Sequence, residues 1–581
     1  MSELTTDVLV VGAGPAGLTA AALLARLGVS SLTVSKYGAT ADSPRAHITN
    51  QRAVEILRDL GIEERVRQRA LPHDLMGKQV FATAFAGREL SRMMTWGTGA
   101  RRADYEAASP CEMCNAPQHV LEPMLLDQAR HFGADIRFDH ELVGLEARAD
   151  AVIARVRRRG TGEEIAIRSR YVVGCDGARS VVADAGGFRF DGQAGLANAV
   201  TVWIEADLSR YTMHRSGALF FVCPPGGEDV FSIWTCVEPW TEWSTIFAHF
   251  GGRPADLSEE RIMSRVRRAI GDPTVAVRIK KISEWQVKHM VAAHYRSGRL
   301  FLAGDAAHRH PPANGLGSNT SIQDAYNLAW KLALVVNGRA DDRLLDSYGD
   351  ERQPVGRQVV DRANQSVMEM GGWLGALGFQ PDQSEADALA KVDRLFGSEG
   401  EEQRRALLAG LEQMNWQFNA HGVELNQRYV SGAVSDEGTP FPPYERDAEL
   451  YYQPTTHPGA HLPHVWLERD RRAVSTLDLC AYDRFTLITG IGGDDWVEAA
   501  RQVSRATGVP INPVVVGLGQ VNNDVLGTWT RMREVDDRGC LLVRPDRTVA
   551  WRSAGGRADA TAVLGEVMET VLGRGARRSA H

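Results

Sequence analysis

Short apolar runs without alternation are the first feature of the hydrophobic pattern. They occur at residues 7–11, 31–34, 165–173 and 300–303. Such runs are typical of strands buried on both faces, as in a parallel sheet covered by helices. After the last run, apolar residues recur at helical spacing from Ile322 to Val336, and Gly338 is placed to end the helix. Residues 320–323, Thr-Ser-Ile-Gln, fit a capping box, so we expect this helix to begin near residues 318–321.

Between about residues 190 and 290 the pattern changes to alternating apolar and polar positions. The expected strands are 199–205, 217–222, 230–236 and 244–249, after earlier candidates at 134–138, 141–147 and 152–157. Alternation is typical of an antiparallel sheet with one buried face. Most tryptophans of this region are expected in the core. A sheet packed on helices can also roof an apolar cavity, and Trp203 and Trp234 are candidates for its wall.

The composition supports a large globular protein. The chain has 581 residues, 44% of them hydrophobic, enough for about two to four domains. Its net charge is −7 without a basic tail, so nucleic acid and anionic membranes are disfavoured as partners. No apolar run approaches the length of a membrane span. Seven scattered cysteines favour a reduced, cytoplasmic protein over a disulfide framework.

One CxxC pair, Cys111 and Cys114, needs an interpretation. A structural zinc site requires a second pair of Cys or His ligands at suitable spacing, and the sequence offers none. A thioredoxin motif would require its own βαβ context. We therefore expect no metal site and interpret both residues as packing thiols.

A glycine-rich turn follows the first predicted strand. Gly12, Gly14 and Gly17 form the pattern GxGxxG, with Ala16 before the last glycine, and a helix follows directly. The first glycine permits the tight turn, the second lets the backbone approach a pyrophosphate, and the third lets helix and strand pack closely. The sequence therefore predicts a dinucleotide site at this turn.

The end of the second strand departs from the usual dinucleotide fold. It continues as Ser35-Lys36, where the fold normally has Asp or Glu for the ribose hydroxyls. Two alternatives stay open at this position. Either Ser35 or another group holds the ribose, or the Lys36 ammonium faces a phosphate.

Polar residues elsewhere have both a functional and a purely structural interpretation. Arg45 could reach a cofactor, or lie in solvent, and the amide of Gln118 could face a ligand. His47 is either a general base or a hydrogen-bonded loop histidine. Asp176 is either a turn-forming residue or part of a cofactor site. Asp305 could accept hydrogen bonds from a ligand hydroxyl, or cap the backbone of an ordinary turn.

The loop after Asp305 leads into an uncovered helix N-terminus. Its conformationally special residues are Pro311, Pro312, Gly315 and Gly317. The first N–H groups of a helix lack acceptors and carry partial positive charge. This end of the predicted strand therefore suits an anionic or electron-rich ligand.

The three turns together resemble those of the class A flavoprotein monooxygenases, the single-component aromatic hydroxylases. The segments PRAHITNQR, ARRADYE and GDAAHRHPPANGLGSNTSIQDAYNLAWK are most similar to the phenol hydroxylase branch, and the resemblance covers the whole chain. It implies an α/β fold with an FAD-binding Rossmann-like domain of the glutathione-reductase type, an inserted, mostly antiparallel substrate-domain sheet, and a C-terminal thioredoxin-like domain without the redox CxxC. The implied boundaries are 1–185 (FAD-binding, with a substrate-domain segment at about 75–110), 186–295 (substrate sheet), 296–400 (FAD-binding and helices), 401–449 (linker) and 450–581 (thioredoxin-like).

The resemblance implies a tightly bound FAD and assigns residues to it. The pyrophosphate and sugars would be held by Gly12, Gly14, Ala16, Gly17, Ser35, Lys36, Gly304 and Asp305. The flavin ring would be flanked by Arg45, Gln118 and Pro312, and its N1–C2 edge would face Gly315, Gly317, Ser318 and Asn319. Asp176 would belong to a motif linked with both FAD and nicotinamide binding.

The implied reaction is the ortho-hydroxylation of a phenol to a catechol. NADPH or NADH would reduce the flavin as a transient cosubstrate, and O2 would add to give an electrophilic flavin C4a-hydroperoxide. Removal of the phenol proton accelerates attack because phenolate pushes charge onto the ortho carbon. His47 matches the candidate base of the family. The substrate pocket would be lined by Asn115, Trp203, Trp234 and Pro311.

One departure from the family pattern and several alternatives remain. Close relatives within the resembling branch have Asp where this chain has Asn115, and Asn cannot remove a proton at neutral pH. The same chemistry could act on a larger aromatic, such as a polyketide or a hydroxyphenylpropionate. The chain could also be a non-catalytic flavin-binding regulator. We expect a homodimer or a higher oligomer, and the sequence leaves the choice between NADPH and NADH open.

Overall fold

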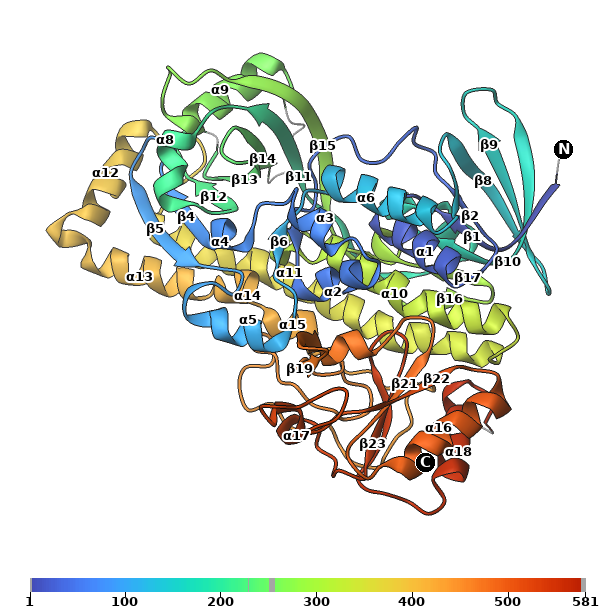
Figure 1. Cartoon of the computed structure of the whole chain (residues 1–581). Coiled ribbons are helices and arrows are strands. Elements are labelled where there is room, and N and C mark those ends of the chain that lie inside the picture. The colour runs from blue at the N-terminus through green and yellow to red at the C-terminus, as the bar shows by residue number, and fades with distance from the viewer. Residues whose placement is uncertain (1–2, 228, 250–255, 576–581) are drawn as a thin grey trace.

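The computed structural model describes residues 3–227, 229–249 and 256–575. Two eight-stranded sheets and a four-stranded C-terminal sheet organise the described residues. In Figure 1 the second large sheet lies at the upper left, the first at the right, and the C-terminal sheet below both.

The first sheet is built around parallel strands in the order β17-β10-β1-β2-β7. These strands are β1 (Glu3–Val11), β2 (Ser31–Val34), β7 (Asp135–Arg137), β10 (Glu164–Gly174) and β17 (Leu300–Leu302). The apolar runs at the ends of β1 and β10 and those of β2 and β17 are buried, which confirms the prediction of strands covered on both faces there. The antiparallel additions are β8 (His140–Ala147), β9 (Val152–Arg158) and β16 (Arg296–Ser297).

Three helices that flank the first sheet carry much of its core. They are α1 (Pro15–Arg26), α6 (Gln118–His131) and α10 (Gly317–Val336), and α1 packs against the other two. The capping-box prediction was wrong. Helix α10 begins at Gly317 without a side-chain cap, and the Ser321 hydroxyl donates to the Gly317 carbonyl at 2.8 Å. Because the helix begins several residues earlier, Thr320 lies inside it rather than at its N-cap.

The second sheet has the order β18-β15-β11-β14-β13-β12-β4-β5. Its strands are β4 (Lys78–Ala82), β5 (Glu89–Met94), β11 (Phe190–Glu205), β12 (Leu219–Val222), β13 (Ser232–Glu238), β14 (Glu242–His249), β15 (Arg278–Ala292) and β18 (His308–Arg309). All neighbours are antiparallel except β4 and β12. The hydrophobic pattern missed β15, because most of its side chains are partly exposed on both faces.

Helix α11 (Asp346–Leu377) packs an aromatic core against this sheet. The Trp373 ring lies 5.1 Å from Phe81 and 5.6 Å from Phe221, both in edge contact. Residues 401–449, expected to be a linker, contain α13 (Glu401–Glu412), α14 (Asn415–Phe418) and α15 (His421–Leu425). Helix α13 packs on α11, and the buried Leu407 and Leu411 of α13 join the apolar core of the second sheet.

Short elements complete the first two layers. Strand β3 (Ile48–Thr49) pairs antiparallel with β6 (Cys114–Asn115). The remaining helices are α2 (Gln51–Asp59), α3 (Glu63–Arg67), α4 (His73–Met76), α5 (Arg102–Ala108), α7 (Val181–Ala185), α8 (Ser209–Thr212), α9 (Glu259–Ile270) and α12 (Glu385–Phe396). Asn50 caps α2 by accepting a hydrogen bond from the Ala53 N–H at 3.0 Å.

The C-terminal sheet has the order β22-β21-β23-β24. Its strands are β21 (Phe485–Thr489), β22 (Ile511–Val515), β23 (Cys540–Val543) and β24 (Val549–Ser553), with α16 (Asp494–Thr507), α17 (Thr528–Met532), α18 (Ala560–Val571) and the hairpin β19 (Trp466–Arg469) and β20 (Arg472–Ser475) beside them. Some of its buried side chains, such as Leu487 and Leu542, join the apolar cluster of the first sheet, whereas others, such as Ile488 and Leu541, form a separate cluster. None of the described helices is long and apolar enough to span a membrane.

Candidate active site

The three predicted turns meet at one edge of the first sheet. Val11 at the end of β1 pairs with Gly174 of β10, and Gly174 pairs with Leu302 of β17. The GxGxxG turn, Asp176 and Gly304-Asp305 therefore leave three adjacent parallel strands at the same level. A Cβ on Gly304 would lie 3.3 Å from the Cβ of Ala16, which places the last turn against the first turn of α1.

The glycines of the first turn have different surroundings. A Cβ on Gly12, which has φ of +109°, would collide with the carbonyl of Cys175, and one on Gly17 would collide with the carbonyl of Gly12. A Cβ on Gly14 would meet nothing closer than Oε1 of Glu122 at 3.8 Å. Gly12 and Gly17 are thus needed for packing, whereas Gly14 leaves free space at the N-terminus of α1. That space and the helix N–H groups fit the pyrophosphate of FAD.

The two aspartates at this edge have different partners. The Asp176 carboxylate accepts hydrogen bonds from the Ser180 hydroxyl at 2.5 Å and the Val181 N–H at 2.7 Å. Burial raises its pKa. Asp176 thus stabilises the turn before α7. The Asp305 carboxylate is exposed and has no hydrogen-bond partner within residues 3–227, 229–249 and 256–575, so it is free to accept from a ribityl hydroxyl.

A buried charge cluster supports the Gly304-Asp305 turn. The sequence pattern did not predict it. Asp324 of α10 accepts hydrogen bonds from the Gly304 N–H at 3.0 Å, from Nε2 of His308 at 2.8 Å and from Nε of Arg352 at 2.8 Å. The side chains of Asp324, His308 and Arg352 are all fully buried. A charged residue within the apolar face of a predicted helix was the available signal.

Asn319 joins the start of α10 to the segment that carries His47. Its amide nitrogen donates to the carbonyls of Ile48 at 2.8 Å and Gly315 at 2.6 Å. Its amide oxygen accepts from the Asn50 N–H at 3.0 Å. Gly315 has φ of +65°, and a Cβ there would lie 2.9 Å from the Cβ of Ile48. The proline–glycine loop and the His47 segment therefore pack directly against each other.

His47 is half-buried beside this loop. Its Nδ1 is buried and has no partner among the described residues. Burial, together with the charge of a protonated His119, lowers the pKa of His47 to about 3. The imidazole is therefore neutral at pH 7.

Arg45 and Gln118 lie together near the first turn of α1. The backbone carbonyl of Arg45 accepts from the Gln118 N–H at 2.8 Å, and the Arg45 side chain is exposed. The Gln118 amide donates to Glu122 at 2.5 Å, so part of its hydrogen-bonding capacity is used within α6. Glu122 also accepts from the Ala41 N–H at 2.6 Å, and burial raises its pKa. No motif marked this buried carboxyl.

The four predicted pocket residues differ in placement. Asn115 is fully buried, its amide nitrogen donates to the Cys236 carbonyl at 2.9 Å, and its Oδ1 has no partner among the described atoms. Trp203 is partly exposed and donates to Glu242 at 3.0 Å. Trp234 has no exposed surface and packs edge-on against Phe85 at 5.0 Å, within the core of the second sheet. Pro311 is buried, next to the exposed Pro312.

The remaining predicted residues lie at the same sheet edge or on α10. Ser35 is buried and Lys36 is partly exposed directly after β2. Gly317 and Ser318 form the first turn of α10. Cys111 and Cys114 are free buried thiols, and burial raises the pKa of both. No group of three metal-ligating side chains occurs within the residues that the structure describes.

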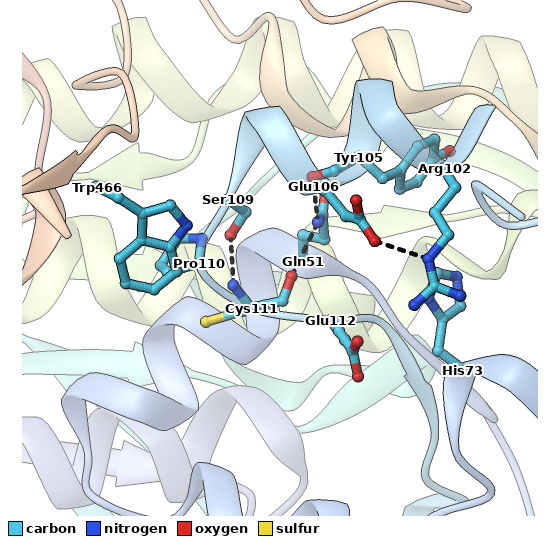
Figure 2. Close-up of a pocket in the computed structure, with 10 residues that line it drawn as sticks. All are labelled: Gln51, His73, Arg102, Tyr105, Glu106, Ser109, Pro110, Cys111, Glu112 and Trp466. Carbon is cyan, nitrogen blue, oxygen red and sulfur yellow. Dashed lines mark hydrogen bonds and ion pairs between the residues drawn. The ribbon is translucent and has the colours of Figure 1, made fainter. Parts of the chain in front are cut away.

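A separate cavity of about 280 Å³ lies between α2, α5 and the C-terminal Trp466. Figure 2 shows its lining residues. The Gln51 amide nitrogen there donates to the carbonyls of Tyr105 and Cys111, and the Arg102 guanidinium pairs with Glu106. Since these polar groups are already paired, the cavity offers little to orient an aromatic substrate.

Comparison with known proteins matches the family model "FAD binding domain" to residues 5–363 and "Aromatic-ring hydroxylase, C-terminal" to residues 455–575. The chain is 45% identical to 2,4-dichlorophenol 6-monooxygenase of Delftia acidovorans, over 95% of each chain. It is 46% identical to the enzyme of that name from Cupriavidus pinatubonensis, over 99% of this chain and 98% of the relative.

Among solved structures, the flavin-dependent monooxygenase PieE in complex with FAD and substrate has a TM-score of 0.96 and 46% identity, covering 99% of this chain and 100% of PieE. The fold, the free space at Gly14 and the exposed Asp305 agree with these matches. The chain therefore belongs to the class A flavoprotein aromatic hydroxylases of the phenol hydroxylase type, and it is an FAD-dependent aromatic monooxygenase that uses NAD(P)H and O2.

Proposed function

We propose that this enzyme hydroxylates a phenol at the ortho position to give a catechol. The observation that carries the proposal is the position of His47 beside the proline–glycine loop, where its buried Nδ1 has no hydrogen-bond partner among the described residues and its segment is held by the Asn319 contacts to Ile48 and Asn50. A neutral imidazole can remove a phenol proton, and phenolate is the more reactive nucleophile. The names of the two 2,4-dichlorophenol 6-monooxygenases support a phenolic substrate.

We assign FAD to the edge where the three turns meet. The N–H groups of Ala16 and Gly17 would bind the pyrophosphate, and the Asp305 carboxylate would accept from the ribityl chain. Ser35 and Lys36, at the end of β2, would face the adenosine half, and Asp176 would shape the adjoining turn. Arg45, Gln118 and Pro312 would adjoin the flavin, with the N-terminus of α10 at its N1–C2 edge.

The chain's own residues would then prepare the substrate. Bound FAD, reduced by NAD(P)H, supplies the oxygen-activating chemistry. His47 accepts the phenol proton at its accessible ring nitrogen while the buried Nδ1 faces the protein. The partly exposed Trp203 and the buried Asn115 and Pro311 would shape the pocket, with Trp234 supporting it from behind. Asn115 would contribute shape and a hydrogen-bond acceptor rather than charge.

A direct experiment tests this function. The purified holoenzyme is supplied with NADPH or NADH and a panel of phenols, and catechol formation is followed by chromatography together with nucleotide consumption. We expect His47→Ala to retain FAD and to lose catechol formation by about 100-fold, most severely for phenols of high pKa. Wild-type protein that forms no ortho-hydroxylated product from any phenol overturns the proposal. Product formed from larger phenolic aromatics alone would revise the substrate class.

The C-terminal unit and the assembly are part of the same proposal. We infer a thioredoxin-like unit, supported by a central pair of parallel strands, β21 and β22, with antiparallel β23 and β24 and flanking helices.

We also infer a homodimer, supported by side chains in one C-terminal loop that are more than half exposed: Leu518, Val521, Val525 and Leu526. The unpaired thiols support a cytoplasmic location. Sedimentation equilibrium tests the dimer, and a monomer at micromolar concentration contradicts it.

A further inference from the structure

Two imidazoles beside the proposed substrate space have unused ring nitrogens. Nδ1 of His47 and Nδ1 of His119 are both buried and lack a hydrogen-bond partner among the described residues. Buried polar atoms in folded proteins are normally paired, so an unpaired ring nitrogen marks a place for a water or a ligand atom. His119 belongs to no recognised motif, and it directly follows Gln118 in the first turn of α6.

The backbone places the two histidines on adjoining segments. Ile48 of β3 pairs with Asn115 of β6, and the Gln118 N–H donates to the Arg45 carbonyl at 2.8 Å. Residues 45–49 and 114–119 therefore run side by side. Protonation of His119 lowers the pKa of His47, which is the electrostatic effect expected of neighbouring imidazoles.

Contacts through Trp203 connect His119 to charged groups that reach solvent. Its ring centroid lies 5.4 Å from that of Trp203. The Trp203 indole donates to Glu242 at 3.0 Å, and the Lys280 ammonium binds the same carboxylate at 3.0 Å. Burial lowers the pKa of His119, the Glu242 charge raises it, and the Lys280 charge lowers it. The Glu242 and Lys280 side chains are 22% and 21% exposed, so water reaches this end of the cluster.

Resting on the proposed role of His47, we propose that His119 receives the phenol proton from His47 and passes it to solvent beside Glu242. The phenol O–H bond breaks as an N–H bond forms on His47. The proton then moves to His119, through a bridging water, and leaves to bulk water, so both imidazoles return to their neutral form without any transfer of electrons. Asn115 is buried, and its amide cannot take the proton. The proton therefore needs another acceptor, which the relay supplies.

The test uses the oxidised holoenzyme without oxygen and NAD(P)H, so turnover does not enter the readout. Para-nitrophenol is mixed with enzyme in weak buffer, and phenolate absorbance and proton release to an indicator dye are followed by stopped flow. We expect His119→Gln to retain FAD and to release the proton about tenfold more slowly, with recovery on addition of imidazole. His131→Gln, in the last turn of the same helix, serves as the control and should behave as wild type.

The outcomes separate the relay from the proposed function. An unchanged proton-release rate and pH profile in His119→Gln overturn the relay, even where His47→Ala abolishes catechol formation. Wild-type enzyme that forms no catechol overturns the proposed function, while slow proton release in His119→Gln still supports the relay. If His119→Gln does not retain FAD, His119→Asn replaces it in the same measurement.

Discussion

Gly12 and Gly14 lie two residues apart but differ in the space around them. A side chain at Gly12 would collide with the Cys175 backbone at a φ of +109°, whereas at Gly14 the nearest atom is 3.8 Å away and φ is −85°. We expect Gly12→Ala to prevent stable folding, because the Cys175 backbone it meets directly follows β10 and cannot move away without shifting that strand. Gly14→Ala should fold normally as the flavin-free protein and bind FAD at least about tenfold more weakly, which corresponds to about 1.4 kcal/mol.

Two measurements check the glycine pair. The thermal midpoint of each flavin-free variant reports folding, and titration with FAD reports affinity. A Gly14→Ala protein that binds FAD as tightly as the wild type would show that the pyrophosphate does not pass over this residue.

His421 makes folding sensitive to acid. It is fully buried, stacks 3.7 Å from Tyr105, and contacts Oε1 of Gln51 through Nε2 at 2.8 Å, while its Nδ1 has no partner among the described residues. Burial lowers the pKa of His421 from 6.5 to about 3. The unfolded chain therefore binds a proton below about pH 6.5 that the native protein excludes. Stability is complete above the unfolded pKa and falls as the pH decreases toward the folded pKa.

This residue should contribute a slope of about 1.4 kcal/mol per pH unit between those pKa values. The urea midpoint of wild type and His421→Gln, measured from neutral to mildly acidic pH, tests the slope. We expect the variant to be less stable at pH 7 and to lose less stability on acidification. Equal slopes for the two proteins would mean that His421 takes up a proton in the native state as readily as in the unfolded chain.

At the scale of elements, Asn319 links three segments that the sequence separates widely. Its side chain binds the carbonyls of Ile48 and Gly315 and the N–H of Asn50, all next to His47 or the proline–glycine loop. Asn319→Ala removes these bonds and leaves buried groups unpaired, so we expect a loss of about 1–3 kcal/mol of unfolding free energy. Faster hydrogen exchange should be concentrated in residues 46–50.

Ser318→Ala is the matched control for this change. Ser318 lies in the same first turn of α10, and its hydroxyl has no hydrogen bond within the described part of the chain. It should exchange as the wild type does. Protection at residues 46–50 that is identical in both variants would rule out a clamp by Asn319.

The sequence predicted those elements that depend only on residues close together along the chain. The buried parallel strands follow from their apolar runs, and Gly12 follows from a turn that needs positive φ. The missed features depend on distant partners. Strand β15 has no continuous buried face, and Asp324 gains its role from His308 and Arg352. Tertiary contacts of this kind leave no periodic signal along the chain.

At the scale of the whole molecule, the C-terminal unit is fastened to the FAD-binding layer by buried charges. Glu351 of α11 accepts hydrogen bonds from both terminal nitrogens of Arg544, at 2.6 and 2.8 Å, and from Lys331 of α10 at 2.7 Å. Asp546 pairs with the same guanidinium at 2.5 Å. A second contact joins Arg58 of α2 to Asp478 at 2.9 Å. Because α2 follows the His47 segment, the C-terminal unit supports the elements that build the site.

Removal of one charge from this buried cluster should destabilise the entire chain. Arg544→Met leaves the Glu351 carboxylate, which has no exposed surface, with Lys331 as its remaining cation, and we expect a loss of about 3–5 kcal/mol. Arg557→Met removes an exposed pair with Asp559 in the same unit and should change stability by less than about 1 kcal/mol. The quadruple change of Lys331, Glu351, Arg544 and Asp546 to apolar residues of similar size should recover much of the loss, because all four members of the buried charge cluster are then removed. Urea unfolding monitored by flavin fluorescence and by circular dichroism checks all three proteins. If the signals separate in Arg544→Met, so that flavin stays bound while the C-terminal unit unfolds, the two parts fold independently and the charge cluster does not support the site.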